Sequence, residues 1–357
     1  MGTISLCMIV RDEEDVLGRC LRCVEGIADE IIIVDTGSQD RTKEIASAFT
    51  ERIYDFPWQD DFAAARNASF AKARMDYIMW LDADDVIDAE NQQKLRACKP
   101  LLDADVVMMP YHVAFDAHGQ PTFTYERERL LRRACGFRWE GAVHEVIVPA
   151  GRVVHSDIAI CHRKERVHDP DRNLRILARQ LAHDGTPDVR TQYYYARELY
   201  AHGQYDTALH YFDAVLSAPD GWVENRLDAC LQAAGCCLAQ GKRGGALAYL
   251  CRSFQWDVPR AEICCEIGRI LLEENRCEQA AFWYETALKA KLCSGGGFCQ
   301  PDCHDYIPFM QLCVCHDRMG HRSLARAYNE RAGRIKPRDA NVLHNRQYFA
   351  DGGINPD

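Results

Sequence analysis

The stretch Tyr77-Ile78-Met79-Trp80-Leu81-Asp82-Ala83-Asp84-Asp85 decides the fold of the first half of the chain. A continuous apolar run that ends in three carboxylates indicates a strand buried on both faces, as in a parallel sheet flanked by helices. Carboxylates at the carboxyl end of such a strand lie where α/β folds bind ligands. Because clustered negative charges repel, they indicate a divalent-cation site. The alternative is a solvated loop whose aspartates precede a helix.

Strand-like and helix-like patterns alternate on both sides of this stretch. Apolar runs at residues 4–10 and 31–34 predict further strands, and residues with helical spacing separate them. Such alternation with short connections is the signature of a parallel sheet. A charged segment at residues 157–171 is the expected end of this domain. The sequence therefore predicts an α/β domain over residues 1–171.

From Arg172 onward the pattern is helical almost throughout, and it repeats. Helix, tight turn and helix recur around Gly203, Gly241 and Asn275, with spacings of 241 − 203 = 38 and 275 − 241 = 34 residues. A period near 34 with small and aromatic residues at matched places is the tetratricopeptide signature. Helix pairs of this kind bury their apolar faces only by stacking. We therefore expect an all-α, tetratricopeptide-like repeat domain over residues 172–357.

The composition limits the class of protein. At 357 residues the chain has room for two domains, and its 47% hydrophobic content is that of a soluble globular protein. A net charge of −10 argues against a nucleic-acid binder. No apolar run approaches the roughly 18–20 residues that span a bilayer, and no secretory signal is expected. The 18 cysteines fall mostly within helical or strand patterns, which favours reduced, buried thiols and a cytoplasmic protein.

An insertion at residues 293–304 interrupts the repeats. It contains Cys293, Cys299, Cys303 and His304, which suggest zinc, but their spacing fits none of the usual paired-cysteine arrangements. A glycine-rich loop between two helical hairpins is the favoured alternative.

Five segments of the first half of the chain form a recognisable series. These are residues 5–14 (SLCMIVRDEE), 33–42 (IVDTGSQDRT), 65–67 (ARN), 80–85 (WLDADD) and 139–145 (WEGAVHE). In these residues and in their order, the first half of the chain resembles the family-2-type glycosyltransferases of the GT-A (Rossmann-like) fold. Combined with carboxy-terminal repeats, the chain looks like bacterial tetratricopeptide-containing glycosyltransferases, a group that includes enzymes modifying bacteriocin-like peptides.

The resemblance implies a UDP-sugar donor and a Mn²⁺ or Mg²⁺ cofactor. Asp82 and Asp84 match the family's Asp-x-Asp motif, in which the first carboxylate usually faces the ribose and the second usually reaches the metal; Asp85 is the reserve candidate. The metal stabilises the leaving diphosphate as a Lewis acid. Asp35 matches the residue that accepts from the uracil ring, although it could instead only start a turn with Gly37.

Other residues of the five segments are expected near the nucleotide. Glu14, like Glu13, follows the first strand and could line the crevice, or it could only start a helix. Arg66 matches a family residue beside the nucleotide, since arginine suits a phosphate or a base edge; a surface charge on an alanine-rich helix is the alternative. Arg132, with Arg129, could neutralise the diphosphate.

The last segment supplies the expected catalytic group. Inverting transfer needs a carboxylate that removes a proton from the acceptor, and Glu145 is the candidate. His144 is a candidate metal or diphosphate contact, and Trp139 could stack against a sugar ring. Alternatively, His144 and Glu145 only orient a loop. His155 and His162 could also approach the metal.

These expectations combine into a metal-dependent inverting glycosyltransferase that moves a sugar from a UDP-sugar to a peptide or protein acceptor. The repeats would present the acceptor or mediate a homodimer. The alternatives are transfer to a cell-envelope saccharide, a nucleotidyltransferase, and an inert first domain on an interaction protein. A nucleotidyltransferase usually needs a glycine-rich basic loop after the first strand, whereas residues 11–14 (RDEE) are mainly acidic.

Overall fold

The computed structural model describes residues 2–163, 169–183, 188–291 and 298–352. The chain divides into two compact units, residues 1–183 and 184–357. Helix α5 (Arg172–His183) belongs to the first unit, where Arg179 pairs with Asp60 at 2.6 Å and Arg172 lies over the ring of Phe62. This division lies twelve residues after the expected boundary at 171/172, because those two arginines attach α5 to the α/β unit.

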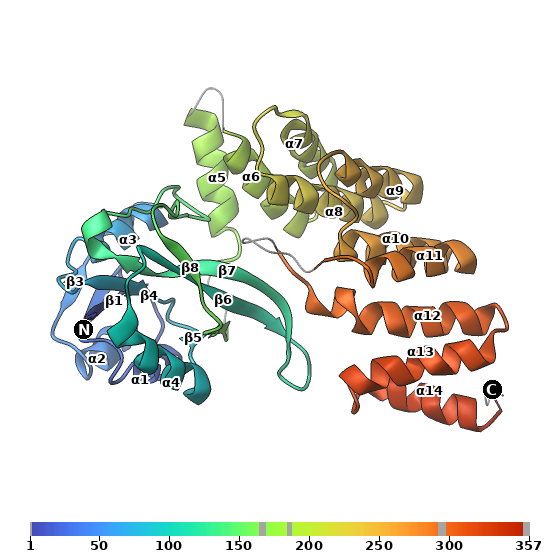
Figure 1. Ribbon diagram of the computed structural model, residues 1–357. Coiled ribbons are helices and arrows are strands. Elements are labelled where there is room, and N and C mark those ends of the chain that lie inside the picture. Colours follow the sequence, from blue (N-terminus) through green and yellow to red (C-terminus); the bar gives the residue numbers. More distant parts are fainter. Residues whose placement is uncertain (1, 164–168, 184–187, 292–297, 353–357) are drawn as a thin grey trace. The chain divides into compact units, whose positions relative to one another are not determined.

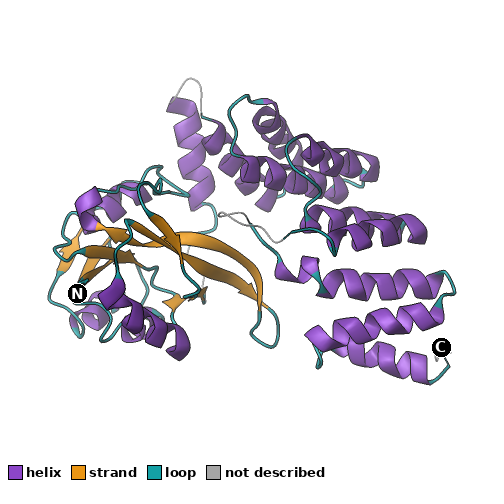
Figure 2. Cartoon of the chain, in the orientation of Figure 1, coloured by secondary structure: helices purple, strands orange, loops and turns teal. Residues whose placement is uncertain are grey.

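The first unit is built on a nine-stranded mixed sheet in the order β3-β2-β1-β4-β7-β6-β9-β5, with β8 paired to β6 (Figures 1 and 2). The strands are β1 (Ile4–Val10), β2 (Glu30–Asp35), β3 (Ile53–Asp55), β4 (Tyr77–Trp80), β5 (Asp85–Val86), β6 (Val106–Phe115), β7 (Pro121–Arg132), β8 (Val153–His155) and β9 (Ile160–His162). Strands β1 to β4 pair in parallel, as the sequence predicts, and β7 is antiparallel to β4.

Both faces of the parallel strands are covered, which explains their continuous apolar sequences. The helices of this part are α1 (Leu17–Cys23), α2 (Thr42–Ser47), α3 (Phe62–Phe70) and α4 (Ala89–Cys98), followed by the 3₁₀ turns η1 (Lys99–Leu101) and η2 (Arg133–Cys135). Alternate β1 residues such as Leu6 and Met8 belong to one core with Leu21 of α1. Cys7 belongs to a second core with Phe70 of α3 and Trp80.

Strands β1, β2 and β4 end at the same edge of the sheet, because parallel strands run in one direction. The register pairs Val10 with Asp35 and Cys7 with Trp80. The acidic residues that follow β1, β2 and β4 therefore come together beyond their carboxyl ends, as expected for a ligand crevice.

The second unit consists of helical hairpins. Its helices are α6 (Val189–Ala201), α7 (Tyr205–Ser217), α8 (Val223–Ala239), α9 (Arg243–Arg252), α10 (Ala261–Glu273), α11 (Cys277–Ala287), α12 (Tyr306–Arg318), α13 (Arg322–Ile335) and α14 (Ala340–Ala350), with 3₁₀ turns η3 (Ser253–Gln255) and η4 (Pro301–His304). This confirms the tetratricopeptide-like pattern. No helix in the described ranges is long and apolar enough to cross a membrane.

Four hairpins use the same turn. Gly203, Gly241, Asn275 and Gly320 have positive φ angles of 71°, 72°, 59° and 81°. The N–H of the following residue donates to a carbonyl five residues earlier, for example Lys242 to Cys237 at 2.8 Å and Arg276 to Leu271 at 2.9 Å. This is the Schellman arrangement, which satisfies free carbonyls at a helix end and favours glycine. The described cysteines are all free thiols and most are buried, as expected.

We predict that Gly241→Ala destabilises the helical unit by about 1 kcal/mol, because a Cβ is strained at positive φ. Nothing lies within 4 Å of the added Cβ, so backbone strain is the whole effect. The matched control is Gly244→Ala inside α9, which is equally open and has no positive φ; its stability should stay equal or rise. Urea denaturation followed by circular dichroism measures both, and equal effects would contradict the assignment of the turn.

Candidate functional site

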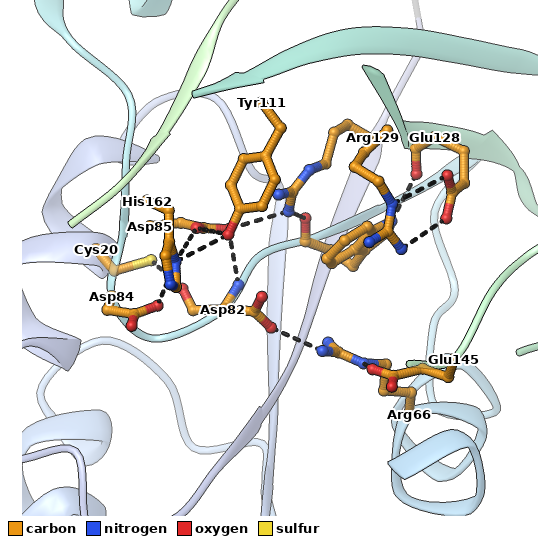
Figure 3. A network of polar contacts seen from close by, with 12 residues as sticks. Cys20, Arg66, Asp82, Asp84, Asp85, Tyr111, Glu128, Arg129, Glu145 and His162 are labelled. Atoms are coloured by element: carbon orange, nitrogen blue, oxygen red, sulfur yellow. Dashed lines mark hydrogen bonds and ion pairs between the residues drawn. The ribbon is translucent and has the colours of Figure 1, made fainter. Parts of the chain in front are cut away.

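The carboxylates after β4 lie in a tight turn whose centre is Asp85. The Asp82 N–H donates to Asp85 Oδ2 at 3.0 Å, and the Asp85 N–H donates to the Asp82 carbonyl at 3.1 Å. Asp85 is fully buried. Arg129 Nη1 donates to Asp85 Oδ2 at 3.0 Å, and the Tyr111 hydroxyl donates to Oδ1 at 2.7 Å (Figure 3). Both carboxylate oxygens of Asp85 therefore accept hydrogen bonds from groups inside the protein.

The partner of Asp85 is itself a buried cation. Arg129 is fully buried, and its guanidinium lies 3.7 Å from the ring centroid of Trp80 and 4.3 Å from that of Tyr111. Its Nη1 also donates to the Trp80 carbonyl at 3.1 Å. Burial and the charge of Asp85 raise the pKa of Tyr111 well above its usual range, so its hydroxyl stays a donor. Arg129 thus links the end of β4 to the turn that follows it.

Asp84 lies beside a histidine from the far part of the sheet. Pairing of β5 with β9 sets Asp85 opposite His162. His162 Nδ1 lies 3.1 Å from Asp84 Oδ1, 3.4 Å from Asp85 Oδ1 and 2.9 Å from the Tyr111 hydroxyl. Burial lowers the pKa of His162, but the hydrogen bonds and charges of Asp84 and Asp85 outweigh it and raise the pKa to about 10. Potential metal-ligand atoms of Asp84, Asp85 and His162 lie within 4.8 Å of one another.

Asp82 is joined to Glu145 through Arg66. On helix α3, Arg66 donates from Nη2 to Asp82 Oδ1 at 2.8 Å and from Nε to Glu145 Oε1 at 2.5 Å (Figure 3). The Arg66 guanidinium lies over the rings of Trp80 and Trp139 at 5.1 and 4.8 Å. Burial would raise the pKa of Asp82, but the charges of Arg66 and Arg129 lower it, so Asp82 is an anion. The structure therefore brings together three residues that the sequence placed in separate segments.

The acidic residue of the first segment that faces this cluster is Glu13. Burial, followed by repulsion from Asp84 and Asp82, raises the pKa of Glu13 to about 7. Glu14 instead accepts from the Arg41 N–H at 3.2 Å and from Arg41 Nε at 3.3 Å, in an exposed pair. The expectation that Glu14 lines the crevice is corrected to Glu13, because the loop after β1 turns the next side chain toward Arg41.

Asp35 ends β2 and is buried. Its Oδ1 accepts from the N–H groups of Gly37 and Ser38, each at 2.9 Å, so it does start a turn. Its Oδ2 is buried without a hydrogen-bond partner among the described residues. Buried acceptors usually have a donor, so Asp35 Oδ2 is an acceptor open to a ligand.

Comparison with known proteins agrees with this geometry. Residues 5–158 match the model of the family described as Glycosyl transferase family 2. These residues form a family 2 glycosyltransferase domain. Three curated relatives each match about 40% of the chain. They are a TPR repeat-containing protein of Synechococcus elongatus (40% identity over 152 residues, 41% of this chain and 36% of the relative), the SPbeta prophage-derived glycosyltransferase SunS of Bacillus subtilis (29% over 154 residues, 40% and 34%), and the lipopolysaccharide core biosynthesis glycosyltransferase LpsC of Rhizobium meliloti (28% over 160 residues, 42% and 58%).

The alignments span about a third of the length of the first two relatives. Among solved structures, TarS of S. aureus in complex with UDP-GlcNAc covers 69% of this chain and 91% of its own at 13% identity, with a TM-score of 0.40. MamA covers 47% and 90% at 15% identity, also with a TM-score of 0.40.

Two residues expected to contact the donor are engaged in other contacts of the glycosyltransferase domain. Trp139 is only 3% exposed and packs edge-to-face on Trp80 with ring centroids 4.8 Å apart, so it cannot stack on a sugar. Arg132 lies opposite Tyr77 at the amino end of β4 and pairs with Asp105 at 2.9 Å. It therefore cannot reach a diphosphate held near Asp82 at the other end of that strand.

His144 adopts φ 52° next to Glu145, whereas the imidazole beside Asp84 is that of His162. His155 forms an exposed pair with Glu126 at 2.9 Å. His162, which the sequence also offered as a residue near the metal, is thus a histidine that the structure places beside Asp84. Tyr111 and Arg129 were not expected to hold Asp85; the available signal was an arginine directly before the apolar pair Leu130-Leu131 of β7.

We predict that Arg129→Met destabilises the glycosyltransferase domain by about 3–5 kcal/mol, because it leaves the buried Asp85 carboxylate uncompensated. The matched control is Arg132→Met on the same strand, whose ion pairs are partly exposed and should contribute far less. Chemical denaturation followed by tryptophan fluorescence measures both variants. Equal stability of the two variants would contradict the structural role of the buried pair.

Proposed function

We propose that the chain is a metal-dependent inverting glycosyltransferase that moves a sugar from a UDP-sugar to a peptide or protein acceptor. The observation that carries the proposal is the line Asp82–Arg66–Glu145 beside Asp84, at the carboxyl edge of the sheet of a family 2 domain. A carboxylate suited to metal binding and a carboxylate suited to proton transfer are held a fixed distance apart by one arginine.

The residues present fit a hard divalent cation. Side chains of Asp82 and Asp84 are 32% and 19% exposed, so their oxygens reach the solvent side of the turn. Carboxylate oxygens are the ligands that Mn²⁺ and Mg²⁺ prefer. Asp84 and Asp82 would hold the ion, while Asp85 would keep its structural role. When bound, the ion would stabilise charge on the leaving diphosphate.

Asp35 would accept from the uracil ring. An imide N–H is the kind of donor that Asp35 Oδ2 lacks among the described residues. Gly37 and Ser38 fix the other oxygen, so the carboxylate would keep one orientation when the base binds. The uracil would then lie at the end of β2, and the diphosphate of the UDP-sugar would lie toward the end of β4, two strands away in the sheet.

Glu145 would accept the proton of the attacking acceptor group. Arg66 occupies its Oε1, so the proton would go to Oε2. The side chain of Glu145 is 11% exposed, which limits competition from water. A single base on the face opposite the leaving group corresponds to direct displacement with inversion. Arg66 would keep this base oriented relative to Asp82 throughout the reaction.

We predict that Asp84→Asn abolishes sugar transfer and release of UDP from UDP-sugars, because a neutral amide holds Mn²⁺ or Mg²⁺ poorly. A panel of UDP-sugars, read by UDP released in the absence of acceptor, measures this and identifies the donor sugar. Asp103→Asn is the control, since Asp103 is 73% exposed and pairs with Arg132. Full wild-type activity of Asp84→Asn, or in excess chelator, would end the metal assignment.

We predict that Glu145→Gln lowers turnover by roughly 10²–10⁴-fold with little change in donor affinity, the usual contribution of a general base. The glutamine Oε1 can still accept from Arg66, so the loop should keep its position. Glu140→Gln in the same segment, where the side chain is exposed, is the control. Near-normal turnover of Glu145→Gln would assign the base elsewhere. A thiol acceptor would reduce the effect, since it is already partly ionised near neutral pH.

The helical unit would present a peptide or protein acceptor, because tetratricopeptide-like stacks form extended binding surfaces. Transfer to a cell-envelope saccharide is the second candidate, and the similarity to a protein named for lipopolysaccharide core biosynthesis favours keeping it. Radiolabelled sugar transferred into a cell lysate decides between them. Label that protease digestion makes acid-soluble supports a protein acceptor, and label that resists protease contradicts it.

A further inference from the structure

A second cluster of metal-binding side chains lies in the helical unit, far in the sequence from the acidic turn. Glu262 lies in the first turn of α10, Cys299 lies just before η4, and His304 is the last residue of η4. Their donor atoms all lie within 4.8 Å of one another. His304 Nε2 lies 4.0 Å from Cys299 Sγ and 3.7 Å from Glu262 Oε1. One imidazole nitrogen is thus flanked by a thiol and a carboxylate.

All three side chains are nearly enclosed. The side chains of Glu262 and His304 are 6% and 9% exposed, and Cys299 is 9% exposed. The Gln300 N–H donates to Glu262 Oε1 at 2.9 Å, which fixes the carboxylate against the η4 segment. A buried carboxylate normally needs a cation beside it.

We propose that Glu262, Cys299 and His304 bind a structural zinc ion. Thiolate, imidazole and carboxylate are the three ligand types that zinc takes in proteins. Bond lengths of about 2.3 Å to sulfur and about 2.0–2.1 Å to nitrogen or oxygen put tetrahedral ligand atoms roughly 3.3–3.6 Å apart. The observed separations therefore close by about 0.4 Å on binding, a change that side-chain rotation provides. The fourth position takes a water molecule.

The ion would join two segments that are 37 residues apart, since 299 − 262 = 37. Between them lie the rest of α10, helix α11 and the insertion that breaks the repeat period. The η4 turn contacts both α10 and α12. A zinc ion at this point would hold the returning chain against the start of α10 and so fix where α12 begins. This is a stabilising role that is independent of sugar transfer.

The neighbouring thiols of Cys265 and Cys303 make contacts of their own, outside the proposed zinc site. Cys265 Sγ lies 3.5 Å from the Cys303 carbonyl, and Cys303 Sγ lies 3.8 Å from Gln300 Oε1. Neither thiol shares the set of atoms that Glu262, Cys299 and His304 bring together. Cys293 lies outside the described residues and has no part in the proposal. Among the described residues, the ligand set thus differs from the sequence suggestion, because Glu262 of a helix joins Cys299 and His304 whereas Cys303 does not.

The test measures metal content of the full chain purified without chelator, by mass spectrometry of the metals. We expect about one zinc per chain in the wild type and a substoichiometric amount in Glu262→Gln, Cys299→Ser and His304→Ala. Loss of a ligand should lower the zinc affinity, measured by competition with a chelator, by more than the roughly 10–100-fold that loss of an outer-shell partner costs. Cys251→Ser, an exposed thiol of the same unit, and Asp84→Asn should both keep the zinc.

Cobalt supplies a readout that does not depend on a variant's stability. The wild-type chain, produced in medium with Co²⁺ in place of Zn²⁺, should show a thiolate-to-cobalt charge-transfer band, and Cys299→Ser should lose it. If Cys299→Ser does not fold, Glu262→Gln, which keeps the shape of the side chain, should still lower zinc content. A wild type without zinc or cobalt, or ligand variants with undiminished metal, would overturn the proposal.

Discussion

The buried ion pair between Arg129 and Asp85 is the interaction on which the site depends. Neither group reaches water, so each is stable only in the presence of the other. Asp85 closes the turn by accepting from the Asp82 N–H, and Arg129 ties that turn to the Trp80 carbonyl at the end of β4. The direction in which Asp82 and Asp84 present their carboxylates follows from this pair.

The three aspartates therefore differ in role despite their closeness in sequence. Asp85 is wholly internal, Asp82 is neutralised by Arg66, and Asp84 lies beside His162. At the end of β1, burial and then repulsion from Asp84 and Asp82 raise the pKa of Glu13. Arg66 also fixes Glu145 relative to Asp82. It bonds to Glu145, 79 residues later in the sequence, and to Asp82, 16 residues later. Ion pairs thus position the acidic residues of the crevice, from Asp85 in the turn to Glu145.

Much of this arrangement follows from the sequence alone. Parallel strands that end in acidic residues must bring those residues to one edge, which explains why Asp35, Asp82 and Asp84 were predictable. The errors concern side-chain direction. Arg129 and Arg132 are three positions apart on β7, so they face opposite sides of the sheet and lie roughly 10 Å apart along it. Since β7 is antiparallel to β4, Arg132 lies at the amino end of β4, and only Arg129 reaches its carboxyl end at Trp80. Which of Glu13 and Glu14 faces the cluster depends on the loop after β1, and the approach of His162 to Asp84 depends on the pairing of β5 with β9.

If the turn after β4 is a metal-dependent site for a nucleotide diphosphate, the affinity for UDP must depend on the metal. Isothermal titration of the full chain with UDP, in Mn²⁺ and in Mn²⁺-free buffer with chelator, measures this dependence. We expect Mn²⁺ to tighten UDP binding by roughly tenfold or more, which corresponds to about 1.4 kcal/mol or more, and Asp84→Asn to remove the gain. Equal affinity with and without the metal, or no UDP binding at all, would contradict this assignment.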